Sequence, residues 1–286
     1  MSAQNSFATA EVLDLYRWAT QDPPAQAAVL AEIYRRIRGQ PAQVLREDFA
    51  GNAADSVAWV AADSRRRAIA VDFDAPTLAY ARARAQRLLG DECQRIDFHC
   101  GDVHDLHPPA VERAQLLCVL NFSCFYFHQR AQLVRYFEHA FASLDETGVL
   151  VLNAFGGAGA MQPRRDTHRI TPQSEAGTAA LAAFDYEWEQ RSFDACQARL
   201  DCRIHFVVSD PDAPGGRRRI DDAFRYDWRL WSLPELRECL MAAGLREVQV
   251  WRHNVIDKAD KPEVFLGPVD TLQGLDLWLA YVIAIR

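Results

Sequence analysis

The chain lacks the long apolar run that a membrane-spanning helix requires. No stretch of about eighteen consecutive apolar residues occurs in it, so we expect no membrane partner. Residues 1–10 also lack the basic segment and the apolar stretch that are typical of a secretory signal peptide. Both absences favour a cytoplasmic protein.

An excess of positive charge is also missing. Lys and Arg number 32 against 39 Asp and Glu, which gives a formal net charge of -7. A surface of this sign repels phosphate backbones and anionic lipids, so we expect no nucleic acid partner. Two arginine runs, 65–67 and 217–219, depart from this balance, and we interpret both as solvated loops or strand ends.

Paired cysteine motifs are absent as well. The chain has 7 cysteines, an odd number, and no two of them have the spacing Cys-x-x-Cys. Several lie in apolar runs, as Cys118 does within residues 116–120. This pattern predicts buried thiols in a reducing compartment, and neither disulfides nor a zinc site.

What the sequence does contain is an alternation of short apolar strands and amphipathic helices. Hydrophobic residues make up 49% of the chain, so a full core is expected. Residues 10–39 have helical spacing, and the break at Asp22-Pro23-Pro24 divides them into two helices. Almost continuously apolar strands between helices indicate a parallel sheet covered on both faces. The strands are expected at 43–48, 68–72, 95–100, 115–122 and 148–155, and the helices between them at 53–62, 76–89 and 129–144.

A different pattern begins near residue 160. Residues 186–192, 198–209 and 219–230 alternate between apolar and polar, with turn residues between them, which is typical of an antiparallel meander. A helix at 233–243 and strands at 247–251 and 277–285 follow. The sequence therefore predicts an α/β fold with an inserted β-rich segment.

The first strand ends in an unusual group of charges. Arg46, Glu47 and Asp48 follow an apolar strand and precede a tight turn and a helix. Buried charges are costly without partners, and a helix N-terminus offers unpaired N–H groups. The segment fits a polar ligand site, and it fits equally a strand–helix junction held by an Arg46 salt bridge.

Acidic or amide side chains also end the next strands. Asp72 lies about twenty residues beyond Gly51, which places a carboxylate beside the first turn, within reach of both hydroxyls of a ribose. The alternative for such a residue is capping of the helix that begins near Pro76, a role that Asp74 fits better. The third and fourth strands end near Asp102 and Asn121, and ligands bind at this edge in open α/β sheets.

Taken together, these elements resemble the class I S-adenosylmethionine-dependent methyltransferases over essentially the whole chain, and within them a bacterial subgroup of undefined acceptor. The resemblance implies a Rossmann-like, doubly wound, mostly parallel seven-stranded sheet with an inserted antiparallel β meander and an N-terminal helical lid. It implies a lid at 1–40, a cofactor-binding core at 41–158, an insertion over the acceptor site at 159–231 and completion of the core sheet at 232–286. The motifs that carry it are Arg46-Glu47-Asp48-Phe49-x-Gly51, Asn121-Phe122-Ser123, Phe155-Gly156-Gly157 and Tyr226-Asp227-Trp228-Arg229-Leu230-Trp231.

The resemblance also implies a set of residues that bind S-adenosyl-L-methionine. Glu47 and Gly51 would hold the methionine end, and Asp72 would bind the ribose. Asp102, with the backbone of Val103, would contact the adenine. The predicted site also includes Phe73 beside Asp72, and Asn121 as the floor near the sulfonium.

Three further residues of the predicted site have two interpretations each. Arg46 pairs with the cofactor carboxylate or with a neighbouring acid of the protein. Tyr16 and Trp18 pack an amphipathic helix, or they cover the sulfonium, since aromatic faces favour positive charge. In the family's arrangement the N-terminal helices close over the cofactor, which favours the second interpretation.

The first turn departs from the family pattern. Phe49 and Ala53 occupy places where the family has glycine, so only Gly51 remains. A bulkier turn beside Glu47 and Asp48 disfavours the pyrophosphate of a dinucleotide and suits a cationic sulfur.

The sequence therefore predicts in-line methyl transfer to a small-molecule acceptor. The alternatives are a nicotinamide-dependent oxidoreductase and a non-catalytic cofactor-binding protein. No catalytic base is assigned, although His128, Tyr126 and His104 are the nearest candidates, and a homo-oligomer is compatible with the sequence.

Overall fold

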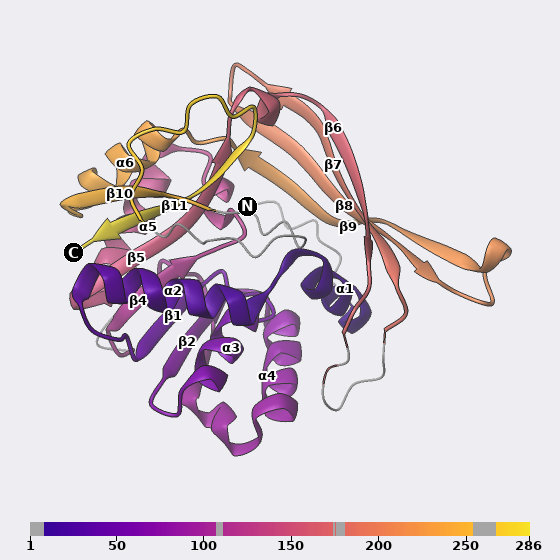
Figure 1. The fold of residues 1–286 in the computed structure, drawn as a ribbon, viewed down its shortest axis with the longest axis horizontal. Helices are drawn as coiled ribbons and strands as arrows, with labels where there is room; N and C mark the ends of the chain where they lie inside the picture. Colours follow the sequence, from indigo (N-terminus) through magenta and orange to yellow (C-terminus); the bar gives the residue numbers. More distant parts are fainter. Residues whose placement is uncertain (1–8, 107–110, 174, 176–180, 254–266) are drawn as a thin grey trace.

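The computed structural model describes residues 9–106, 111–173, 175, 181–253 and 267–286. These residues form two β-sheets (Figure 1). The larger sheet has seven strands in the order β10-β11-β5-β4-β1-β2-β3, and the smaller has four in the order β6-β7-β8-β9. In the larger sheet β1 to β5 pair in parallel, whereas β11 runs antiparallel to both β5 and β10. Its strands are β1 (Val44–Asp48), β2 (Arg67–Asp72), β3 (Ile96–Cys100), β4 (Ala114–Val119), β5 (Leu144–Gly156), β10 (Glu247–Arg252) and β11 (Trp278–Ile285).

Helices cover both faces of the larger sheet. One apolar cluster joins α2, α3 and α4 to one face, and another joins α1, α5 and α6 to the opposite face. Neighbouring strand residues divide between the clusters, as Leu116 and Leu117 of β4 do, which is why the strands are apolar at nearly every position. The α-helices are α1 (Ala10–Thr20), α2 (Pro23–Arg38), α3 (Ala54–Ala62), α4 (Ala75–Leu89), α5 (Arg130–Ser143) and α6 (Leu233–Ala242).

Local sequence signals explain where the N-terminal helices begin and end. Thr9 and Asp22 are the N-caps of α1 and α2, and their side chains accept the N–H groups of Val12 and Ala25. Helix α2 ends at Gly39, which has a left-handed backbone with φ 72°. None of the described helices is long and apolar enough to cross a membrane.

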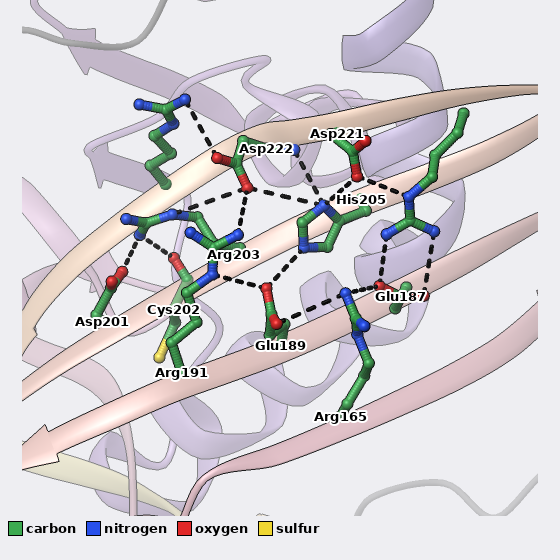
Figure 2. Close-up of polar contacts among 12 residues, drawn as sticks. Arg165, Glu187, Glu189, Arg191, Asp201, Cys202, Arg203, His205, Asp221 and Asp222 are labelled. Carbon is green, nitrogen blue, oxygen red and sulfur yellow. Dashed lines mark hydrogen bonds and ion pairs between the residues drawn. The ribbon is translucent and has the colours of Figure 1, made fainter.

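The smaller sheet is an antiparallel meander that curves away from the larger one (Figure 1). One of its faces carries aromatic and aliphatic side chains that join the same cluster as α1, α5 and α6. Its other face carries charges, among them Arg165, Glu187, Glu189 and Arg203, linked by ion pairs across neighbouring strands (Figure 2). The strands are β6 (Arg164–Ile170), β7 (Phe184–Asp194), β8 (Arg199–Ser209) and β9 (Arg217–Arg229).

The predicted fold class is confirmed, with differences at three strands. β6 was not expected, because Arg164–Ile170 has hardly any apolar residues. β4 ends at Val119 instead of residue 122, because Asn121 and Phe122 have positive φ angles. β5 begins at Leu144, four residues before the predicted start at 148. The division of the chain into four functional parts remains a prediction.

Candidate functional site

The turn after β1 has a left-handed backbone at alternate positions. Phe49, Gly51 and Ala53 have φ angles of 59°, 52° and 50°. For residues other than glycine this backbone conformation costs about 1–2 kcal/mol each. Phe49 and Ala53 therefore hold a conformation that glycine would adopt more easily. A Cβ added at Gly51 would meet no atom within 4 Å, so space for a ligand lies beside the turn.

Three carboxyl groups gather near this turn without a cationic partner. No ion pair among the described residues links Glu47, Asp55 or Asp72 to an arginine or lysine. The Glu47 carboxylate accepts hydrogen bonds from the N–H and hydroxyl groups of Ser56, at 2.8 and 2.5 Å. Burial raises the pKa of Glu47 to about 8, and the neighbouring Asp55 adds to this effect. Burial, with a contribution from Asp22, raises the pKa of Asp55 to about 7. The turn therefore has an excess of buried acid that a positively charged ligand would stabilise.

Asp72 bridges the first turn and the end of its own strand. One carboxylate oxygen accepts the N–H of Gly51 at 2.7 Å, and the other accepts the N–H of Asp74 at 2.9 Å. The adjacent strand is tied in as well, since the Gly101 N–H donates to the Asp72 carbonyl at 3.0 Å. The carboxylate thus lies beside the turn, as its position in the sequence predicted. Each carboxylate oxygen has a second lone pair that can accept a ligand hydroxyl.

Arg46 points away from this group of acids. Its Nε lies 2.7 Å from a carboxylate oxygen of Asp48, and both side chains are almost fully buried. Its Nη1 donates to the Leu106 carbonyl and to the Ser143 hydroxyl, at 2.7 and 3.0 Å. Successive strand residues face opposite sides, which separates Arg46 and Asp48 from Glu47. Of its two interpretations, the ion pair within the protein is the one present in the structure.

The end of β3 brings Asp102 and Val103 to the same edge of the sheet. Asp102 accepts the N–H of His104 at 3.0 Å and lies 2.7 Å from its Nδ1. Burial acts to raise the pKa of Asp102, but these hydrogen bonds outweigh it and the net effect is a lower pKa. Val103 is buried, whereas the Phe73 side chain is 68% exposed. Asp102 is thus available at the edge, and Phe73 makes little contact with the protein.

A pair of left-handed residues follows the end of β4. Asn121 and Phe122 have φ angles of 52° and 60°. The Phe122 N–H donates to the buried Asn153 side chain at 2.8 Å, which fixes the turn against β5. Asn121 therefore sits at the strand end where it was predicted. Sequence reasoning missed Asn153, whose only signal is a polar residue within an apolar strand.

An aromatic cluster lies beside the acids. Tyr16 of α1 has its ring 4.7 Å from that of Phe224 and shares a hydrogen bond with Tyr226. Tyr226 stacks near Trp228 at 4.4 Å between ring centroids, and Tyr126 lies 6.1 Å from Trp228. Tyr16 is close enough to Asp55, and Tyr126 to Asp72, for electrostatic interaction. Aromatic side chains from three separate segments therefore meet beside the turn after β1.

Trp18 lies in a different environment from Tyr16. The Arg17 guanidinium sits over its ring, 4.2 Å from the centroid. Tyr16 therefore joins the aromatic cluster, while Trp18 stacks on a cation of the protein itself.

Three residues near the turn after β1 were not placed in the site by the sequence analysis: Asp55, Tyr226 and Trp228. Asp55 is in the first turn of α3, where an acid is common for helix stability alone. Tyr226 and Trp228 belong to an alternating strand, a pattern that indicates core packing. Only their convergence in space singles them out. Of the candidate bases, His104 is bound to Asp102, and His128 Nε2 lies 2.7 Å from the Asp227 carbonyl.

Comparisons with known proteins place this fold. No family model and no curated protein matches the chain. Solved structures do: DesVI of Streptomyces venezuelae is similar with a TM-score of 0.70 and 17% identity, over 97% of this chain and 98% of DesVI. CalS10 of Micromonospora echinaspora, an amino pentose methyltransferase with bound S-adenosylmethionine, has a TM-score of 0.68 and 15% identity, over 100% of both chains. KedS8 of Streptoalloteichus sp ATCC 53650, a sugar N-methyltransferase, has a TM-score of 0.67 and 17% identity, over 100% of this chain and 97% of KedS8.

The chain has the fold of S-adenosylmethionine-dependent methyltransferases. The similarity extends over both sheets, since each of these proteins is matched almost from end to end. The resemblance predicted from the sequence is thereby confirmed at the level of the fold.

Proposed function

We propose that the protein is an S-adenosyl-L-methionine-dependent methyltransferase that acts on a small-molecule acceptor by in-line transfer. The observation that carries this proposal is the excess of acid around a turn with open space at Gly51: Glu47 and Asp55 are buried, and Asp72 is half-buried. The cofactor brings two positive centres, an ammonium and a sulfonium, whereas a dinucleotide brings a negatively charged pyrophosphate. A bound cation stabilises the ionised form of these acids, whereas a pyrophosphate opposes it, so the region favours the sulfonium cofactor over the nicotinamide alternative.

In this proposal the strand ends divide the cofactor between them. Asp72 accepts the ribose hydroxyls, and Glu47 and Gly51 hold the methionine end. Asp102 and the Val103 backbone contact the adenine. Asn121 forms the floor near the sulfonium.

The remaining predicted residues have more limited parts. Tyr16 covers the sulfonium as part of the N-terminal lid. Phe73 and Trp18 lie at the margin, and Arg46 supports the sheet from its opposite face. The cofactor supplies an activated methyl group, so the protein's own work is to align the acceptor and exclude water.

We further propose that the acceptor atom is an amine nitrogen beside the aromatic cluster. Tyrosine hydroxyls can accept its N–H hydrogens, and aromatic faces stabilise the positive charge that the nitrogen gains on methylation. CalS10 and KedS8, which have the same fold, act on an amino pentose and on a sugar nitrogen. A small amine therefore suits both the aromatic cluster and the acceptors of these two similar proteins.

The test has two stages. Calorimetric titration with S-adenosylmethionine, S-adenosylhomocysteine and NADH should show binding of the first two in the micromolar range and none of NADH. A metabolite extract with labelled cofactor should then yield a labelled, N-methylated product. NADH binding without S-adenosylmethionine binding would replace the proposal with an oxidoreductase. Cofactor binding without transfer to any metabolite would indicate a non-catalytic binding protein.

A further inference from the structure

A second group of buried charges, with arginine in excess, lies between α1 and α4. We define the arginine cluster as Arg17 of α1 with Arg84 and Arg87 of α4. All three face the carboxylate of Glu175, which belongs to the segment between β6 and β7. Arg84 Nη2 lies 2.7 Å from a Glu175 oxygen, Arg17 Nη1 3.3 Å, and Arg87 Nη2 3.8 Å.

Several donors of this cluster have nothing to bind. The Arg17 and Arg84 side chains are only 6% and 5% exposed, yet the Nε of both and the Nη1 of Arg84 have no hydrogen-bond partner among the described residues. A buried donor without a partner costs about 1–3 kcal/mol, and more for a charged group. Glu175 alone therefore does not satisfy the cluster.

The charge count points the same way. Asp14 is the other acid close to the cluster, and it accepts a hydrogen bond from Tyr80. Among the described residues, three guanidinium groups and two carboxylates lie near one another, which is an excess of one positive charge. A doubly charged anion in place of Glu175 would neutralise the cluster and supply acceptors for the free N–H groups. Arginine forks match the oxygens of a phosphoryl group in geometry.

We propose that the arginine cluster is a binding site for a phosphoryl group, and that Glu175 occupies it until such a ligand displaces the carboxylate. The two helices that carry the cluster also carry or follow residues of the proposed cofactor site, since Tyr16 lies on α1 and α4 begins three residues after Asp72. A phosphorylated acceptor would thus exchange its own anion for the Glu175 carboxylate.

The direct test measures binding of inorganic pyrophosphate to the full chain by calorimetry. Glu175→Gln removes the competing charge and should tighten pyrophosphate binding by about tenfold or more. Arg84→Met added to Glu175→Gln should abolish that gain. The matched control is Glu187→Gln, which removes a carboxylate shared by Arg165 and Arg219 on the exposed face of the meander and should leave pyrophosphate affinity unchanged.

Trp18 provides a second readout in the native chain. Because Arg17 stacks on its ring, pyrophosphate should change the tryptophan emission of the native protein but not of Trp18→Phe. If Glu175→Gln binds pyrophosphate no more tightly than the native chain, or if Glu187→Gln gains as much, the proposal is wrong. If Glu175→Gln fails to fold, an unchanged native emission rejects the site on its own. Cofactor affinity is measured in the same samples, so loss of this site alone leaves the proposed methyltransferase intact.

Discussion

The exposed face of the meander and the cleft side of the molecule use the same charged residues in opposite ways. On the meander, Arg219 pairs with Glu187 and Asp221, and Arg191 pairs with Glu189 and Asp222 (Figure 2). At the cleft, acids gather around the Gly51 turn and arginines gather around Glu175, each in excess. Charges that are paired and close to water need no ligand to explain them, because the ion pairs are part of the fold. Unbalanced charges away from water indicate that a ligand completes them.

His205 is an example of a buried polar side chain on the meander that has partners within the protein. Its side chain is 2% exposed, yet Nδ1 accepts the Asp222 N–H at 3.0 Å and Nε2 lies 3.1 Å from Glu189. Both ring nitrogens therefore have polar partners within the protein.

The largest effect is expected at a charge pair that is both buried and balanced. Arg46→Met would leave Asp48 buried, and among the described residues its remaining side-chain donor would be the Tyr136 hydroxyl, at 2.9 Å. We expect a loss of about 3–5 kcal/mol in the free energy of unfolding, measured by urea denaturation. The control, Arg191→Met on the meander, should lose less than about 1 kcal/mol. Equal losses would contradict the expectation that a buried charge pair costs more to break than an exposed one.

The next effect concerns the acid that touches the Gly51 turn. Asp72→Ala should weaken S-adenosylmethionine binding by about 1–3 kcal/mol, because a charge-assisted hydrogen bond to the ribose is lost. Calorimetry on the folded variant checks this. Asp185→Ala, on the meander, serves as the comparison and should bind normally. Unchanged affinity in Asp72→Ala would remove this residue from the site.

A third prediction uses pH to separate the acids of the cleft from those of the meander. Asp55 and Glu47 have pKa values of about 7 and about 8 in the folded protein, above their unfolded values of 3.8 and 4.5. The folded state therefore holds more protons than the unfolded state in this range, and the free energy of unfolding falls as pH rises from about 4 to 8. Asp55→Asn should remove part of that fall and be more stable than the native chain by about 1–3 kcal/mol at pH 8.

Urea unfolding at several pH values measures this effect. At pH 4 the native chain and Asp55→Asn should differ little, because the acid is protonated in the folded state. Glu187→Gln on the meander should show no such gain at pH 8, since the arginines beside Glu187 lower its pKa. A pH-independent difference for Asp55→Asn would show that Asp55 is ionised throughout.

The smallest effect is expected on the meander itself. Arg219→Gln breaks exposed pairs with Glu187 and Asp221, and such pairs contribute about 0.2–1 kcal/mol each. The stability difference from the native chain should shrink at high salt, and cofactor affinity should not change. Thermal unfolding at low and high sodium chloride provides the measurement. A loss that salt does not reduce would indicate packing by the arginine stem instead of its charge.

The order of elements could be predicted because hydrophobic spacing is local. The break at Asp22-Pro23-Pro24, the strand end at Asp72 and the meander all follow from such patterns. Strand β6 could not be found in this way, because charge covers one of its faces and hardly any apolar residue marks the other. Its pairing with β7 supplies what its own sequence lacks.

The site was predictable only in part, since its contacts join distant segments. The carboxylate of Asp72 could be placed beside Gly51 because parallel strands end at one edge. The contact of Arg17 with Glu175 spans 158 residues, and nothing in either segment indicates it. The backbone of Phe49 also opposes its own preference, since the left-handed shape comes from the surrounding turn.

Strand β11 occupies an interior place in the larger sheet, although it follows all the other strands in the chain. It separates β5 from β10 and pairs with both. A nascent chain on the ribosome therefore cannot close this sheet until Trp278–Ile285 has emerged, and β5 and β10 keep open edges until then. Synthesis of this protein thus includes a late interval of exposed strand edges, in which chaperone contact would matter most.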